Sequence, residues 1–136
     1  MDFFFYGTLR DADVRRQVLG RDLLTAQMEE AVLAGFSPLF VAKATYPTLV
    51  ASPDGHAPGL LARRLGTADA ARLAAFEGPA YCIRTLMVTG RRSGPVAARV
   101  FIIRGEARAV GPPWSLDDWQ RRFKSTFLAT RPFRPR

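Results

Sequence analysis

The chain has 136 residues, of which 48% are hydrophobic and 24% are charged, and its formal net charge is +8 at pH 7. This length suits one domain, and ten Phe, three Tyr and two Trp provide the apolar surface that a disordered chain lacks. The single Cys82 excludes an intrachain disulfide, and with a single His56 it argues against a metal site built from His and Cys ligands.

Neither a membrane nor a nucleic acid is the expected partner. No apolar run approaches the roughly 20 residues that a membrane helix needs, and the first residues do not resemble a secretory signal. We therefore expect a cytoplasmic protein. The basic side chains are spread from Arg10 to Arg136 instead of being gathered on one segment. This charge suits a small anionic ligand and weak nonspecific nucleic-acid contact about equally, so it does not assign a function.

The first predicted elements are a strand and a short helix. Residues 3–6 are all aromatic, which favours a buried strand, and Gly7 ends the run. Asp11 or Asp13 then provides an N-cap for a helix, and Gly20 provides the residue that closes it.

The middle of the chain combines strands with a second helix. Residues 29–42 predict one or two strands, residues 52–55 (Ser-Pro-Asp-Gly) predict a turn, and residues 59–65 predict another strand. The helix that follows ends at Glu77, because Gly78 can adopt the left-handed conformation and the proline after it cannot continue a helix.

The last third of the chain predicts a hairpin and a terminal helix. Residues 85–89 and 95–103 are strand-like, and residues 91–94 supply the turn between them. Ser115 is expected to cap the final helix. The apolar stripe of that helix consists of Leu116, Trp119, Phe123 and Phe127.

Strands outnumber helices in this pattern, which predicts an α+β domain with a curled, barrel-like sheet and flanking short helices. We assign residues 1–110 to this domain. Residues 111–136 are expected to form a C-terminal helix packed on the same domain, followed by a frayed basic tail.

The segment Tyr6-Gly7-Thr8-Leu9 is the first candidate for binding a ligand. A strand that ends in glycine leaves backbone N–H groups that can point at an anion or a carbonyl oxygen. Gly7 permits close approach because it has no Cβ, and Thr8 adds a hydroxyl donor. The same residues also suit an ordinary turn from a strand into a loop, which is the reading that the local pattern alone favours.

Glu77 is the candidate for chemistry. On a helix with about 100° per residue it falls between Leu73 and Ala70 and opposite Arg72, so its carboxyl is expected to face the core or a pocket. Burial and the unfavourable helix dipole in the last turn would both raise its pKa, as a general acid/base at neutral pH requires. The alternative is a side chain that turns outward to solvent.

The other polar residues have simpler explanations. His56 lies in a predicted turn and is expected to be exposed. Cys82 is expected to be a small buried residue, because no partner pattern supports a thiol nucleophile. Glu29 and Glu30 are expected to lie on a solvated strand or turn face.

Four short segments together resemble the γ-glutamylcyclotransferase-like superfamily, and in particular its small AIG2-like branch. Their order and spacing agree with that branch over about residues 2 to 104. The segments are Tyr6-Gly7-Thr8-Leu9, Ala44–Val50, Ala57–Leu61 and Leu73–Tyr81.

The resemblance implies a compact mixed barrel with a pocket over the loop from Tyr6 to Leu9. In the family this loop holds a γ-glutamyl group largely through its backbone, and the residue that matches Glu77 is the acid/base. Tyr81 would lie beside the pocket. The implied reaction releases 5-oxoproline from a γ-glutamyl amine or γ-glutamyl amino acid, through attack by the substrate's own α-amine. It needs no metal and no cofactor.

Two residues differ from the family pattern, and both differences concern the side of the pocket that would hold the leaving group. Ile83 stands where family members often have Arg, and Phe76 stands where Tyr is common. Branch resemblance favours a small-amine or isopeptide leaving group. Two other functions stay open at this point: binding of a carboxylated metabolite without turnover, and, less favoured, association with nucleic acid. The oligomeric state is also open.

Overall fold

The computed structural model describes residues 1–104 and 109–130. Its strands are β1 (Phe3–Phe5), β2 (Met28–Val41), β3 (Pro47–Ala62), β4 (Tyr81–Gly90), β5 (Gly94–Ile103) and β6 (Ala109–Pro113). Its helical segments are η1 (Thr8–Arg10), α1 (Ala12–Leu19), η2 (Thr25–Gln27), α2 (Thr67–Glu77), α3 (Leu116–Arg122) and α4 (Lys124–Ala129).

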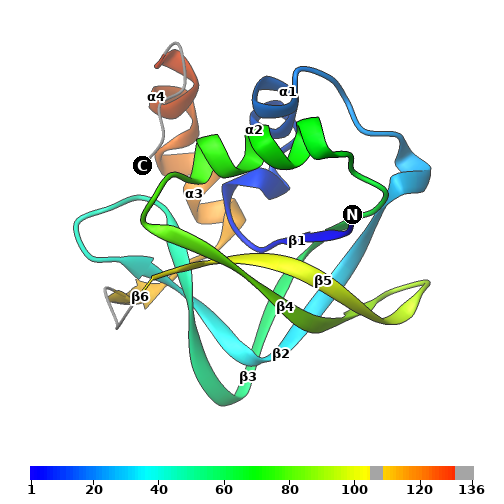
Figure 1. Ribbon diagram of the computed structural model, residues 1–136. Helices are drawn as coiled ribbons and strands as arrows, with labels where there is room; N and C mark the ends of the chain where they lie inside the picture. The colour runs from blue at the N-terminus through cyan, green and yellow to red at the C-terminus, as the bar shows by residue number, and fades with distance from the viewer. Residues whose placement is uncertain (105–108, 131–136) are drawn as a thin grey trace.

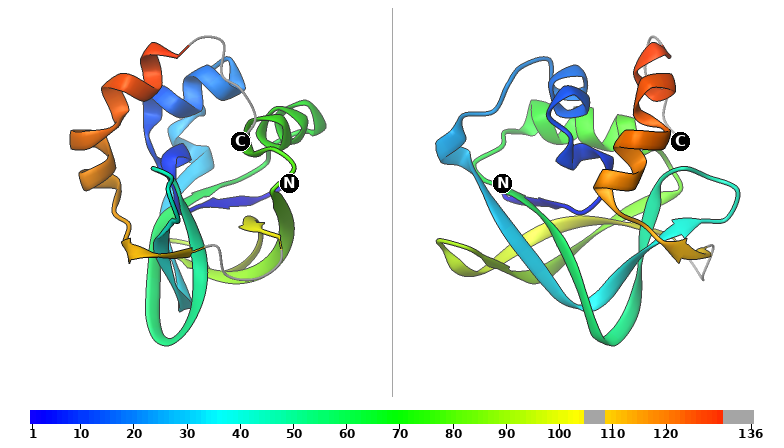
Figure 2. Two further views of the ribbon diagram at one scale, coloured as in Figure 1. Left: turned by 90° about the vertical axis from the view of Figure 1, so that its left-hand side faces the viewer. Right: turned by 180° about the vertical axis from the view of Figure 1, so that it is seen from behind.

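The strands form one mixed sheet that closes into a barrel (Figure 1). The strand order is β3-β1-β5-β4-β2-β6, and an additional β2–β3 pairing joins the first five into a ring. β1 runs antiparallel to β3 and parallel to β5, while β6 pairs antiparallel with β2. The helices gather on one side of this barrel in every view (Figure 2). The predicted α+β class with a barrel-like sheet is confirmed.

The expectation of a turn at residues 52–55 is wrong. These residues lie inside β3, where the register against β2 jumps: Ala34 is opposite His56, whereas Phe36 is opposite Ala51. Both strands pair on either side of the jump, so the turn-forming residues bend the hairpin without reversing the chain. The reversal occurs between the end of β2 and Pro47.

Strand β1 separates two cores. Phe3 and Phe5 belong to the cluster that lies against the helices, and this cluster also includes Trp119. Phe4 and Tyr6 belong to the cluster inside the barrel. The alternation follows from the two faces of a strand, and it explains why all four aromatic residues are buried.

The helix ends follow the sequence signals closely. The Asp11 carboxylate accepts hydrogen bonds at the start of α1, and Gly20 ends that helix with φ 77°. Ser115 caps α3 by accepting from the Asp118 N–H. The terminal helix is interrupted at Phe123, which leaves two short helices, α3 and α4, in place of one.

The predicted tail beyond Thr130 lies outside the described residues. Within the part of the chain that is described, the helices are too short or too polar to cross a bilayer.

Glu29 is buried, so the expectation of a solvated side chain is wrong for this residue. Its carboxylate accepts hydrogen bonds from the Ser93 hydroxyl (2.6 Å), the Ser93 N–H (2.9 Å) and the Arg92 N–H (2.8 Å). The bonds from Ser93, helped by Arg92, lower the pKa of Glu29 to about 2. Glu29 thereby fastens the β4–β5 turn to β2. Its neighbour Glu30 is exposed and pairs with Arg91.

The lowered pKa predicts how stability changes in acid. Because the folded pKa lies below the ordinary value of 4.5, Glu29 contributes its full stabilisation above pH 4.5 and loses it as the pH falls towards 2. Replacing Ser93→Ala should lower the free energy of unfolding by about 1 kcal/mol at pH 7 and flatten its pH dependence in that window. Urea unfolding at several pH values measures both.

The matched control is Glu30→Gln, which removes an exposed ion pair and should change the free energy of unfolding little. If the Ser93→Ala and wild-type curves ran parallel between pH 4.5 and 2, the Glu29 contact would not be the source of acid sensitivity.

Candidate active site at the end of strand β1

A narrow cleft opens where β1 ends. Its cavity volume is about 20 Å³, which is room for about one water molecule. The structure brings all six residues singled out in the sequence to this cleft. The lining consists of Phe4, Phe5, Tyr6, Gly7, Thr8, Leu9, Pro47, Glu77, Tyr81 and Phe101.

The loop after β1 forms the floor of the cleft. The Tyr6 hydroxyl donates to the Phe101 carbonyl oxygen (2.6 Å), which fixes the end of the strand inside the barrel. The chain then turns through η1, where the carbonyls of Gly7 and Thr8 accept from the backbone N–H groups three residues on. Thr8 and Leu9 are both buried, so the loop is held by its own packing as well as by its turn.

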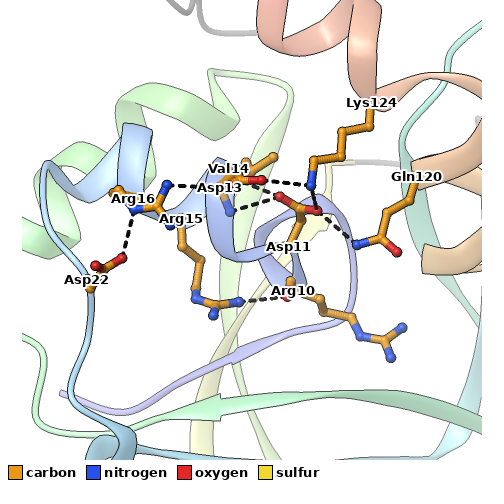
Figure 3. A network of polar contacts seen from close by, with 9 residues as sticks. All are labelled: Arg10, Asp11, Asp13, Val14, Arg15, Arg16, Asp22, Gln120 and Lys124. Atoms are coloured by element: carbon orange, nitrogen blue, oxygen red, sulfur yellow. Dashed lines mark hydrogen bonds and ion pairs between the residues drawn. The ribbon is translucent and has the colours of Figure 1, made fainter.

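A polar network behind the loop holds it in place (Figure 3). The Arg15 guanidinium donates to the carbonyl oxygens of Leu9 (3.1 Å) and Arg10 (2.6 Å). Burial lowers the pKa of Arg15, and the Asp11 charge opposes that effect. Asp11, which directly follows η1, is buried and receives bonds from Gln120 and from Lys124 on α4, both 2.8 Å long.

The charge state of Asp11 follows from these contacts. Burial by itself raises its pKa, but the hydrogen bonds from Lys124, Gln120 and the Val14 N–H outweigh burial and leave the pKa below its ordinary value. The carboxylate is therefore ionised at neutral pH. It connects the loop, helix α1 and the C-terminal helices, a link that no local pattern in the sequence indicated.

Glu77 reaches the cleft from the end of α2. It is the last residue of α2, and Gly78 ends the helix with φ 83°. Its side chain is half-buried and lies on the same face as Leu73, which is fully buried, while Arg72 is exposed on another face. The orientation agrees with the one expected from helical periodicity. Among the described residues that line the cleft, Glu77 is the one that carries a carboxyl group.

Tyr81 and Pro47 complete the wall. The Tyr81 hydroxyl donates to the Pro47 carbonyl oxygen at 3.0 Å, in a buried position, and its ring lies 6.3 Å from that of Tyr46. Sequence reasoning did not place Pro47 or Phe101 at the site. Pro47 belongs to the segment Ala44–Val50, which is one of the four that carry the family resemblance, and this was the signal that could have placed it at the site.

This arrangement suits proton transfer beside a bound polar group. A carboxyl that is half-buried can take and return a proton, and Gly7, Thr8 and Leu9 line the same cleft. His56 and Cys82 do not line the cleft, and Cys82 is half-buried in a neighbouring groove.

The sequence pattern of the family described as "Gamma-glutamyl cyclotransferase, AIG2-like" matches residues 3–121. The chain belongs to this family. Membership suggests an enzyme of the cyclotransferase type, and it agrees with the resemblance that the four short segments carry. A comparison with curated proteins found no significant match.

Solved structures share the fold. The solution structure of At5g39720.1 from Arabidopsis thaliana has a TM-score of 0.69 and 24% identity, covering 94% of this chain and 85% of that one. At3g28950.1 from the same plant has a TM-score of 0.71 and 22% identity, with 94% and 77% covered. The crystal structure of the uncharacterized protein PH0828 from Pyrococcus horikoshii has a TM-score of 0.62 and 17% identity, with 89% and 93% covered.

The two tyrosine hydroxyls at the cleft are expected to stabilise the fold. Each donates to a backbone carbonyl oxygen in a buried position, so Tyr6→Phe and Tyr81→Phe each remove that hydrogen bond. Each change should lower the free energy of unfolding by about 1–2 kcal/mol, measured by urea denaturation. Unchanged stability in both variants would mean that these bonds do not hold the cleft walls.

Proposed function

We propose that the protein is a γ-glutamyl cyclotransferase that releases 5-oxoproline from a γ-glutamyl amide. The observation that carries the proposal is that Glu77, at the end of α2, lines the same cleft as the loop Gly7–Leu9. Family membership supports the same reaction class.

The chemistry needs few protein groups because the substrate contains its own nucleophile. The α-amine nitrogen attacks the γ-carbonyl carbon, a five-membered ring closes, and the bond from that carbon to the leaving nitrogen breaks. Two protons leave the attacking ammonium and two arrive on the departing amine. One of them passes through Glu77, and the other exchanges with water. No electron transfer occurs.

Each wall of the cleft has a role in this reaction. The loop Gly7–Leu9 would hold the glutamyl part through its backbone and the Thr8 hydroxyl, so that the amine is folded back onto the carbonyl. Glu77 would accept a proton from the ammonium and return it to the leaving nitrogen. Tyr81 would support the wall through its bond to Pro47.

The volume of a γ-glutamyl substrate exceeds the volume of the cleft. A γ-glutamyl group is larger than one water molecule, so binding must widen the cavity of about 20 Å³. Pro47 lies at the start of β3, next to the turn that joins β2 to β3. We expect this segment to move outward when substrate enters.

The direct test is release of 5-oxoproline detected by mass spectrometry. Purified protein would be incubated with γ-glutamyl amino acids, γ-glutamyl-ε-lysine, γ-glutamyl polyamines and glutathione. At least one compound should release 5-oxoproline, and Glu77→Gln should lower the rate by a factor of about 10² to 10⁴, because the proton acceptor is lost.

The control for this variant is Glu30→Gln, which removes an exposed carboxylate on β2 that does not line the cleft and should leave the rate unchanged. Circular dichroism would establish that both variants fold. Release that survives Glu77→Gln would contradict the assigned acid/base. Absence of release from every compound would overturn the proposed reaction in favour of binding without turnover.

A second prediction concerns the width of the cleft. A Cβ on Gly7 would lie 3.1 Å from Cγ and 3.3 Å from Cδ of Pro47, so Gly7→Ala narrows the gap that the glutamyl group must enter. We expect kcat/KM to fall by about tenfold. The control is Gly66→Ala, where the added Cβ meets no atom within 4 Å. Equal activity in both variants would place the substrate elsewhere.

A further inference from the structure

A second groove lies directly beside the cleft. It has a volume of about 420 Å³ and runs between the end of α2 and the start of β4. The groove and the cleft share Tyr81 and Phe101 in their walls. Gly78, which follows Glu77 in the chain, lines the groove as well. If the γ-carbonyl of the substrate lies near Glu77, the leaving group lies next to this groove.

Arg104 contributes a cation to the lining of the groove. Arg104 is exposed, and its side-chain Nε donates to the Pro79 carbonyl oxygen at 3.0 Å. The backbone N–H of Arg104 donates to the Ala80 carbonyl oxygen at 2.7 Å. The bond from Nε holds the guanidinium beside the groove. Within residues 1–104 and 109–130, no carboxylate forms an ion pair with Arg104.

The rest of the groove is mainly apolar. Ala74 and Ala75 contribute one wall from α2, and Ile83 contributes the other from β4. Ile83 is 45% exposed, so its side chain presents apolar surface to the groove. An apolar groove whose lining includes a guanidinium matches a molecule with an aliphatic side chain and a carboxylate.

We infer that this groove binds the leaving group, and that Arg104 selects γ-glutamyl amino acids with an aliphatic side chain over γ-glutamyl amines. The inference rests on the proposed function. The carboxylate of the leaving amino acid pairs with Arg104, and its side chain lies against Ile83. A leaving group with a second ammonium would be repelled by the same guanidinium. This choice differs from the small-amine leaving group that branch resemblance favours.

The test compares two substrates that differ only in the carboxylate: γ-glutamyl-leucine and γ-glutamyl-isoamylamine. For the wild-type protein, kcat/KM should be about tenfold higher for the leucine compound. Arg104→Gln should remove this difference by raising KM for γ-glutamyl-leucine, with little effect on the amine compound. Arg104→Lys should restore part of it, since the positive charge returns.

The matched control is Arg84→Gln, which removes an exposed arginine from β4 that does not line the groove. It should leave the preference unchanged, although the net charge falls by the same amount. Release of 5-oxoproline from both substrates at equal rates, or an Arg104→Gln variant that keeps the preference, would overturn the role of Arg104 and leave the proposed reaction standing. Absence of release from both substrates and from the wider panel would overturn the reaction itself.

Discussion

The three-residue strand β1 determines where the cleft lies. It pairs with β3 on one edge and β5 on the other, and its alternate side chains enter two different cores. A shift of one residue would turn Phe3 into the barrel and Phe4 towards the helices, which both cores oppose. The register therefore fixes Gly7 opposite Pro47 and on the same cleft as Glu77. The pairing of β1 with β3 and β5 therefore also sets the position of the loop that follows β1.

A buried carboxylate keeps that loop in place from behind. Asp11 follows the loop directly, caps α1 and binds Lys124 and Gln120 of the C-terminal helices. Removing either partner would leave a buried charge with fewer bonds, which is costly. Arg15 adds bonds to the loop's carbonyl groups. The C-terminal helices therefore help to hold the loop that lines the cleft, through the contacts of Lys124 and Gln120 with Asp11.

Local signals in the sequence predicted the helix ends, the β4–β5 hairpin and the inward direction of Glu77, because caps, turns and helical periodicity act between near neighbours. The features that were missed depend on distant residues. The contact between Asp11 and Lys124 joins residues more than 100 positions apart. The hydrogen bonds from Ser93 to Glu29 join the β4–β5 hairpin to the β2–β3 hairpin. At residues 52–55, the same amino acids suit a turn and a bulge, and only the pairing with β2 decides between them.

We propose that the cleft at the end of β1 binds the γ-glutamyl group. The most direct measurement is a titration of ¹⁵N-labelled protein with 5-oxoproline, followed by amide NMR shifts. We predict that the largest shift changes fall on the amides of Gly7, Thr8 and Leu9 and on residues 77–81, which surround the cleft. Changes centred on another part of the barrel, or no saturable changes, would contradict the claim.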